Sequence, residues 1–171
     1  MYSKPKNQRL PREVYSDPER ITFFTIRATE FSSPFATMHH SPSASRPEAE
    51  FHDRLCQKVL ECLYEQKEKL GCDVLIACLM PDPIHLLARP RTQSANVLDL
   101  MDRFKGKSTN ESWSLGHSGR LWQPRSFDEV LRRDPSIFDT AEYIAHNPVR
   151  KGYILDWSQW PYTVRWDAHV L

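Results

Sequence analysis

The chain has 171 residues, 40% of them hydrophobic, and a formal net charge of +1. This length and composition fit one domain with a core of ordinary size. No apolar run approaches the length that spans a bilayer, and the polar N-terminus lacks the apolar segment of a signal peptide. We therefore expect a cytoplasmic protein that does not enter a membrane.

Cationic side chains are unevenly distributed despite the near-neutral total. Local basic patches can hold a polyanion on such a chain, although any single cluster is more often a solvated surface. One group opens the chain with no acid among its members: Lys4, Lys6, Arg9 and Arg12. Others recur through the second half: Arg103, Lys105, Lys107, Arg120, Arg125, Arg132, Arg133, Arg150 and Lys151.

The first half of the chain predicts an arm, a strand and a long helix. Residues 1–20 are polar and contain prolines, which is typical of an arm with little structure. The β-branched and aromatic run at 21–27 predicts a strand, and the Ser- and Pro-rich stretch at 29–47 predicts a loop. A capping-box spacing at 45–48 predicts the start of a helix that Gly71 ends. Its apolar side chains repeat at four-residue steps: Phe51, Leu55, Val59 and Leu63.

A β-hairpin and a second helix are predicted next. The continuous apolar run at 74–79 predicts a strand buried on both faces, and Pro81-Asp82 predicts a turn before the returning strand at 84–88. Apolar positions from Val97 to Phe104 mark an amphipathic helix. Residues 105–119 predict a flexible connection, and residues 121–130 an extended segment that Trp122 and Phe127 anchor.

The last predicted element is a helix that begins at Asp134-Pro135-Ser136, with Asp134 as N-cap. Pro148 disfavours its continuation beyond Asn147. Four side chains form its buried stripe: Ile137, Ala141, Ile144 and Ala145. The order β-α-β-β-α-β predicts an α+β fold with a ferredoxin-like antiparallel sheet and an additional C-terminal helix that carries Tyr143. Residues 1–20 form the basic arm, residues 21–152 the domain, and residues 153–171 a tail that packs on it.

The four cysteines contain no Cys-x-x-Cys pair. Two of them fall in the helical pattern and two in the strand pattern: Cys56, Cys62, Cys72 and Cys78. This spacing favours buried thiols over a zinc site.

His85 is the first residue that suggests chemistry. Residues two apart in a strand share a face, so a histidine pair at positions 83 and 85 could bind one divalent ion. Position 83 is proline, and Asp82 lies on the opposite side of a regular strand. Taken alone, such a histidine is more often packed and hydrogen-bonded than a ligand.

A second candidate group lies on the last helix. Tyr143 and Asn147 are four residues apart and share a face, with His146 beside them, so we expect the C-terminal end of this helix to expose a phenol, an amide and an imidazole together. A tyrosine can attack a phosphodiester and hold it covalently, and an amide oxygen can complete the coordination of a metal ion that polarises the phosphate. The plainer interpretation is that Tyr143 packs at the helix edge and Asn147 caps the helix. Spacing alone favours that interpretation.

Blocks along the whole chain resemble the REP-associated tyrosine transposases, within the wider HUH-type transposases of insertion sequences. The stretch Met80-Pro81-Asp82-Pro83-Ile84-His85-Leu86-Leu87 resembles the family's Met-Pro-Asp-His-Val-His-Leu-Leu. Tyr143-Ile144 with Asn147-Pro148-Val149-Arg150 and Gly152 resembles its most specific signature. Four further blocks occur in the family's order: Arg9-Leu10-Pro11-Arg12 with Tyr15, Phe104-Lys105 with Lys107-Ser108, Leu121-Trp122-Gln123 with Phe127-Asp128 and Val130-Leu131-Arg132, and Trp160-Pro161-Tyr162.

The resemblance implies a chemistry. Such proteins cut and rejoin single-stranded DNA next to short palindromic hairpins. Tyr143 would be the nucleophile that forms a 5′-phosphotyrosyl link, and His85 and Asn147 would be ligands of Mg²⁺ or Mn²⁺. Two residues depart from the pattern: Pro83 stands where the first metal histidine is expected, and Glu129 stands where many members have histidine. His146 is a possible replacement ligand.

Three hypotheses follow, and whether the chain is an active enzyme stays open at this point. The leading one is a protein that binds single-stranded or hairpin DNA, with its strand-transfer chemistry impaired by Pro83. The others are an active nuclease with a substitute ligand and a domesticated, non-catalytic DNA-binding module. A monomer or a homodimer would serve each of them. Candidate phosphate contacts are Lys105, Arg120, Arg125, Arg132, Arg133 and Arg150, whereas Trp122 and Phe127 fit core anchors better than base-stacking residues.

Overall fold

The computed structural model describes residues 9–29, 33–39, 48–131 and 135–170. Several predictions fall on residues outside these ranges. They concern the cations Lys4, Lys6, Arg132 and Arg133 and the helix N-cap Asp134.

An antiparallel five-stranded sheet forms the centre of the molecule, in the order β6-β1-β5-β4-β7. The hairpin β4–β5 is the predicted one, and every residue of β4 is buried, as its continuous apolar run indicated. The order β6-β1-β5-β4 is the strand order of a ferredoxin-like β-α-β-β-α-β fold, and β7 is added beside β4. The strands are β1 (Ile21–Ile26), β4 (Cys72–Leu79), β5 (Ile84–Pro90), β6 (Phe127–Leu131) and β7 (Thr163–Val164).

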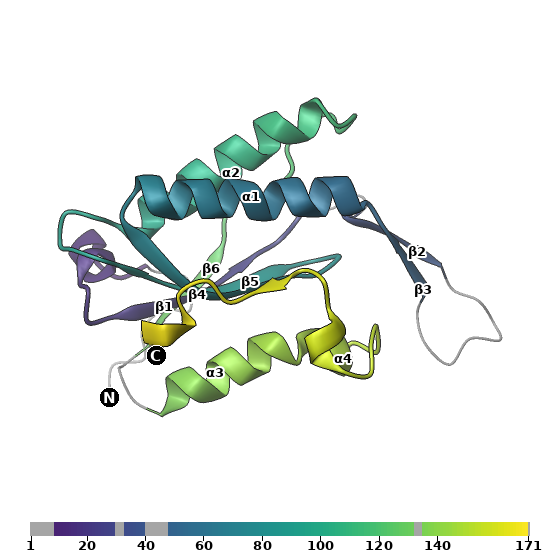
Figure 1. Ribbon diagram of the computed structural model, residues 1–171. Helices are drawn as coiled ribbons and strands as arrows, with labels where there is room; N and C mark the ends of the chain where they lie inside the picture. Colours follow the sequence, from purple (N-terminus) through teal and green to yellow (C-terminus); the bar gives the residue numbers. More distant parts are fainter. Residues whose placement is uncertain (1–8, 30–32, 40–47, 132–134, 171) are drawn as a thin grey trace.

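Helices cover both faces of the sheet. The long helices α1 (Asp53–Lys69) and α2 (Val97–Trp113) pack together on one face, and α3 (Ser136–Ala145) and α4 (Asn147–Arg150) lie on the other (Figure 1). The stripe predicted for the last helix is buried in α3, so its apolar side faces the sheet. These layers confirm the predicted α+β class.

Both long helices differ from their predicted bounds. The segment before α1 forms a hairpin of β2 (Ala36–His39) and β3 (Glu48–Phe51), so the helix begins at Asp53 and Phe51 lies in a strand. The helix α2 continues to Trp113, through residues predicted to be a flexible connection. Ser108 and Ser112 are buried there, and their hydroxyls donate to backbone carbonyls of the same helix. Buried serines do not contribute to a hydrophobic pattern, so the pattern predicted that this helix ends before residue 105.

The core lies between the sheet and its helices. All four cysteines are buried, as predicted, and burial raises the pKa of the Cys72 thiol to about 12.

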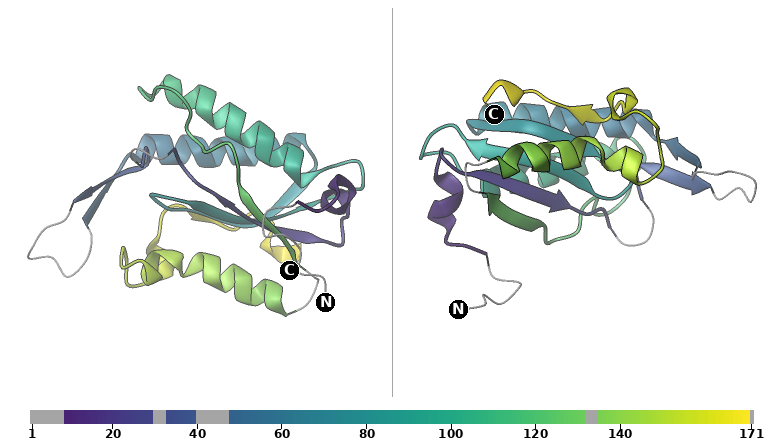
Figure 2. Two further views of the ribbon diagram at one scale, coloured as in Figure 1. Left: turned by 180° about the vertical axis from the view of Figure 1, so that it is seen from behind. Right: turned by 90° about the horizontal axis from the view of Figure 1, so that it is seen from below.

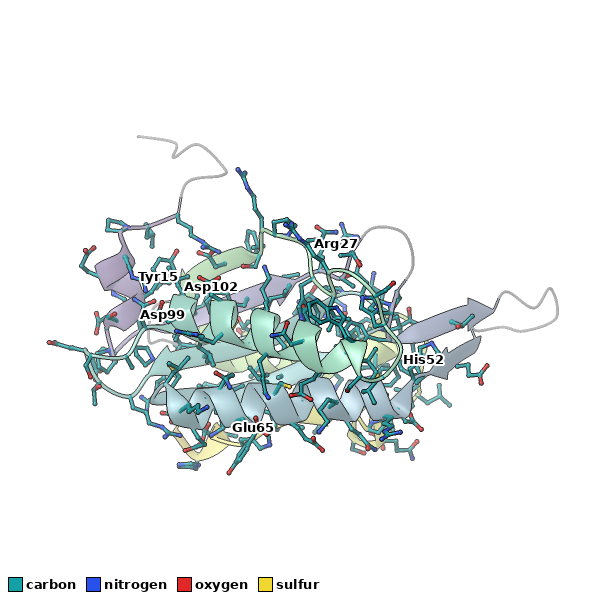
Figure 3. All side chains as sticks on the ribbon, turned by 90° about the horizontal axis from the view of Figure 1, so that it is seen from above. Tyr15, Arg27, His52, Glu65, Asp99 and Asp102 are labelled. Atoms are coloured by element: carbon teal, nitrogen blue, oxygen red, sulfur yellow. The ribbon has the colours of Figure 1, made fainter. Side chains whose placement is uncertain are left out.

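Exposed positions on the outer side of α1 and α2 include acids such as Glu65 and Asp102 (Figure 3). Within the described residues, no helix is long and apolar enough to cross a membrane.

Both ends of the described chain pack on the domain. A short 3-10 helix, η1 (Arg12–Ser16), buries Tyr15, so this part of the predicted arm is structured. Near the C-terminus, β7 pairs with β4, and the indole of Trp160 donates to the Leu79 carbonyl over 3.0 Å. The 3-10 helices η2 (Trp157–Gln159) and η3 (Ala168–Val170) flank β7.

Candidate functional site

His85 lies on the sheet face that α3 covers. Its strand partners on the two sides are Thr25 of β1 and Cys78 of β4. The hydroxyl of Thr25 is 3.0 Å from Nδ1 of His85, and the ring of Phe23 stacks on the imidazole with 5.8 Å between centroids. Burial lowers the pKa of His85 to about 4. The imidazole is therefore neutral at pH 7. Thr25 contacts its Nδ1, and Nε2 is the ring nitrogen that this contact does not use.

Tyr143 approaches this histidine from α3. The centroids of the two rings are 6.2 Å apart, with a T-shaped arrangement. The side chain of Tyr143 remains accessible, because the residue is 40% exposed. The guanidinium carbon of Arg150 lies 4.6 Å from the centroid of the phenol ring. The predicted nucleophile is thus exposed, beside a neutral imidazole and a permanent cation.

Asn147 differs from the prediction. We expected its amide to be exposed with the phenol at the end of one helix. The helix α3 instead ends at Ala145, Asn147 begins α4, and its side chain is buried. Among the described residues, Nδ2 of Asn147 has no hydrogen-bond partner. Half a turn of the amide group would bring the oxygen of Asn147 to the position of Nδ2, so this unpaired end can present either a donor or an acceptor.

His146 does not join this group. Its Nδ1 lies 2.9 Å from the Glu142 carbonyl, and its ring packs against Trp157 with 5.5 Å between centroids. Its contacts are therefore with the helix backbone and the C-terminal tail.

The residues present do not fit a complete Mg²⁺ or Mn²⁺ site. Such ions prefer several oxygen ligands, mostly carboxylates, whereas His85 and Asn147 offer one nitrogen and one amide. Asp82 cannot substitute, because its carboxylate accepts hydrogen bonds from the Arg27 guanidinium and the Ala28 backbone, each at 2.9 Å. Among the described residues, no cluster of three or more histidine, cysteine or acidic side chains could hold a metal ion.

The predicted phosphate contacts are spread over two parts of the surface. Arg120 and Arg125 are exposed in the connection between α2 and β6. Lys105 is partly buried, and its ammonium donates to the Pro124 carbonyl over 2.9 Å, so it ties α2 to that connection. Arg150 is exposed beside Tyr143.

The two aromatic residues of the Trp-Gln block have opposite environments. Trp122 is buried, and its indole donates to the Ser108 hydroxyl over 2.8 Å, which confirms it as a core anchor. Phe127 was also predicted to anchor the core, and this was wrong, because it is 57% exposed at the edge strand β6. Edge strands have fewer neighbours, so hydrophobicity alone overestimated its burial.

Sequence reasoning missed Phe23 and Thr25, which support His85. Alternation along a strand was the available signal: Phe24 and Ile26 are fully buried on one face, so Phe23 and Thr25 point to the other.

Sequence reasoning also missed that two family-like blocks meet on β6. The carboxylate of Asp128 accepts hydrogen bonds from Tyr15 and from Arg9, the latter at 2.7 Å. Burial and this carboxylate raise the pKa of Tyr15 to about 12.

An α+β domain built on an antiparallel five-stranded sheet is the fold class that the tyrosine transposase resemblance predicted. The family comparison agrees: the profile of the IS200-like transposases matches residues 43–147, and the chain belongs to that family. Within it, the chain is similar to a Haemophilus influenzae protein named as a REP-associated tyrosine transposase, at 26% identity over 101 residues. That match covers 53% of this chain and 57% of the relative, so the chain spans little more than half the relative's length.

A solved structure shares the fold. A REP-associated tyrosine transposase, described as bound to a REP hairpin, superposes with a TM-score of 0.66 at 17% sequence identity. The superposition covers 92% of this chain and 82% of that one.

Proposed function

We propose that this protein binds single-stranded and hairpin DNA, and that its capacity for tyrosine-mediated cleavage and strand transfer is impaired. Family membership supports the DNA-binding part, together with a similar fold that is described as bound to a hairpin. One observation carries the second part: Tyr143 lies exposed beside His85, but among the described residues around them there is neither a strong base nor a full set of metal donors.

The expected reaction shows what is lacking. The Oη atom of Tyr143 would attack the phosphorus, the bond to the 3′ oxygen would break, and the strand would stay on the protein as a 5′-phosphotyrosyl ester. The phenol proton must leave Oη, and the departing 3′ oxygen must gain a proton. His85 is a poor acceptor at neutral pH, because its pKa is about 4, whereas a free phenol has a pKa of about 10.

Metal assistance would depend on the same few residues. Of the family-like ligands, His85 and Asn147 are present and Pro83 replaces a third. Disturbing groups that merely support a metal ligand costs roughly 10- to 100-fold in affinity or activity, and losing a ligand should cost at least as much. We therefore expect weak binding of Mg²⁺ or Mn²⁺ and slow cleavage.

The cations remain suited to phosphate contacts. Arg150 lies beside Tyr143, where a scissile phosphate would sit, and Arg125 is exposed just before β6. Each Arg→Ala change should weaken hairpin binding without changing sequence preference. It should also reduce the slope of log affinity against log salt by about 1.

A covalent trapping assay tests the chemistry. Hairpin oligonucleotides labelled at the 3′ end are incubated with protein and Mn²⁺, and a denaturing gel shows whether label travels with protein. We expect little or no transfer with the native chain and clear transfer with Pro83→His. A Pro83→His/Tyr143→Phe double variant is the control that should lose the label. Thermal unfolding with and without Mn²⁺ shows whether Pro83→His folds and has gained a metal site.

Two outcomes would contradict the proposal. Strong, Tyr143-dependent transfer by the native chain would show that cleavage is not impaired. No measurable hairpin affinity at low salt would rule out the DNA-binding function.

A further inference from the structure

Four aromatic rings form a continuous row on the α3 side of the sheet. Phe127 of β6 meets Phe23 of β1 with 6.4 Å between centroids. Phe23 stacks on His85 at 5.8 Å, and His85 meets Tyr143 at 6.2 Å. The pairing of Thr25 with both Phe127 and His85 places these side chains on one face. The row thus leads from the edge of the sheet to the tyrosine.

Only part of this row is covered. The helix α3 packs mainly on β4 and β5, while β1 and β6 extend to one side of it (Figure 2). His85 is accordingly buried, Phe23 is half-buried and Phe127 is 57% exposed. The exposed end is therefore an open aromatic surface, continuous with the site of the expected chemistry.

The strand that carries Phe127 is held from its other face. The next residue, Asp128, points away from the ring row and accepts hydrogen bonds from Tyr15 and Arg9. Among the described residues, the ring of Phe127 has one ring contact, the T-shaped contact with Phe23. An exposed ring on a fixed strand loses little entropy when a planar ligand stacks on it.

We propose that Phe127 and Phe23 form a stacking surface for unpaired bases of the DNA strand that flanks a bound hairpin. This inference rests on the proposed DNA-binding function and assigns a place to the single-stranded part of the ligand. Aromatic side chains on an open sheet face bind bases in this way, and stacking tolerates any sequence because every base has a π-face.

The spacing of the rings selects a single strand. The centroids of Phe127 and Phe23, the two rings of the proposed surface, are 6.4 Å apart, whereas bases in a duplex strand rise by about 3.4 Å. Bases that follow these rings must therefore separate from one another, which paired duplex DNA does not allow. The strand would leave the surface next to Tyr143 and the Arg150 cation.

One charge limits the path of the backbone. Glu129 is exposed two residues after Phe127 and shares its face of β6. Its carboxylate repels phosphates, so the DNA backbone must pass over the end of β6 where Phe127 lies, away from Glu129. Arg125, exposed just before β6, lies toward that end of the strand.

Three forms of one labelled hairpin test the proposal: blunt, with an unpaired extension, and with an abasic extension of equal length. Extensions at the 5′ and 3′ ends are tested separately, and affinity is measured by fluorescence anisotropy. For the form with bases, Phe127→Ala should weaken binding by about 5- to 150-fold, the range of one lost base–aromatic stack. Phe127→Tyr, which keeps the ring, should bind as the native chain does.

The matched control is Phe138→Ala on α3. Phe138 is 56% exposed, much like Phe127, and makes no ring contact among the described residues. This variant should bind all three hairpins like the native chain. The blunt and abasic hairpins should not distinguish Phe127→Ala from the native chain, since they offer no base to the surface. A 2-aminopurine in the extension should be quenched by the native chain and by Phe127→Tyr only.

Each contrary result has its own meaning. Unchanged affinity of Phe127→Ala for the extended hairpin, with tight binding by the native chain, would overturn the stacking surface and leave the proposed function intact. Equal weakening on all three hairpins would also overturn it, by assigning Phe127 to the duplex. Conversion of a native dimer into a monomer by Phe127→Ala, seen by light scattering, would make the surface a self-interface. No hairpin binding by the native chain would overturn both proposals.

Discussion

The two faces of the sheet show different uses of the same strands. On one face, the 17-residue helices α1 and α2 cover fully buried side chains such as Phe24 and Ile26. On the other, the 10-residue α3 covers β4 and β5, buries the polar ring of His85, and leaves Phe127 exposed. Because side chains alternate along a strand, neighbouring residues of similar hydrophobicity serve different purposes. The closed face supplies stability, and the open face carries the candidate site.

The largest expected effect lies on the closed face. Phe24→Ala removes a fully buried ring from β1 and leaves a cavity that the packed helices cannot fill. Substitutions of this kind cost about 3–5 kcal/mol in the free energy of unfolding. Urea unfolding followed by circular dichroism measures the loss. A cost below about 1 kcal/mol would show that this face is not the closed one.

The next effect concerns pH and the buried His85. Its pKa is about 4 in the folded chain and about 6.5 when exposed, so the unfolded chain binds the proton first as pH falls. Stability should therefore fall from about pH 6.5 and level off near pH 4, by about 3 kcal/mol in total. The measurement is the free energy of unfolding at several pH values.

The variant His85→Phe keeps a ring for Phe23 to stack on and removes the titrating group. Whatever the stability of this variant at pH 7, the free energy of unfolding that it loses between pH 6.5 and pH 4 should be about 3 kcal/mol smaller than the loss in the native chain. Parallel curves for the two proteins would mean that His85 is accessible to solvent.

A smaller effect is expected for the stability of Phe127→Ala. The exposed ring loses little burial on truncation, so unfolding should change by less than about 1 kcal/mol. Side by side with Phe24→Ala, this measurement compares the two faces directly. A cost similar to that of Phe24→Ala would show that Phe127 is covered in solution.

The smallest effect concerns the charge beside the open face. Glu129→Gln removes an exposed carboxylate near the proposed DNA path and should tighten hairpin binding about 2- to 5-fold at low salt. The gain should vanish as salt screens the charge. Glu65→Gln, on the outer side of α1, is the control that should change nothing. An equal gain in hairpin affinity from the two substitutions would mean that the net charge of the protein, and not the position of Glu129, determines the effect.

The order of strands and helices followed closely from local patterns. The apolar run of β4 and the buried stripe of α3 predicted their elements, because burial of these segments is visible in their own periodicity. The hairpin β2–β3 and the last turns of α2 did not follow. Their residues are polar or small, and tertiary contacts determine their conformation, as the buried Ser108 and Ser112 illustrate.

The sequence by itself determined the α+β order, the family, and the candidate residues Tyr143, His85 and Asn147. It could not determine which of these side chains solvent reaches. Only the tertiary structure decided that Asn147 is buried, that His146 packs on the tail, and that Phe127 remains open. The physical reason is that exposure depends on which distant element covers a residue. The ten residues of α3 reach across β4 and β5, and the rest of that face remains uncovered by the helix.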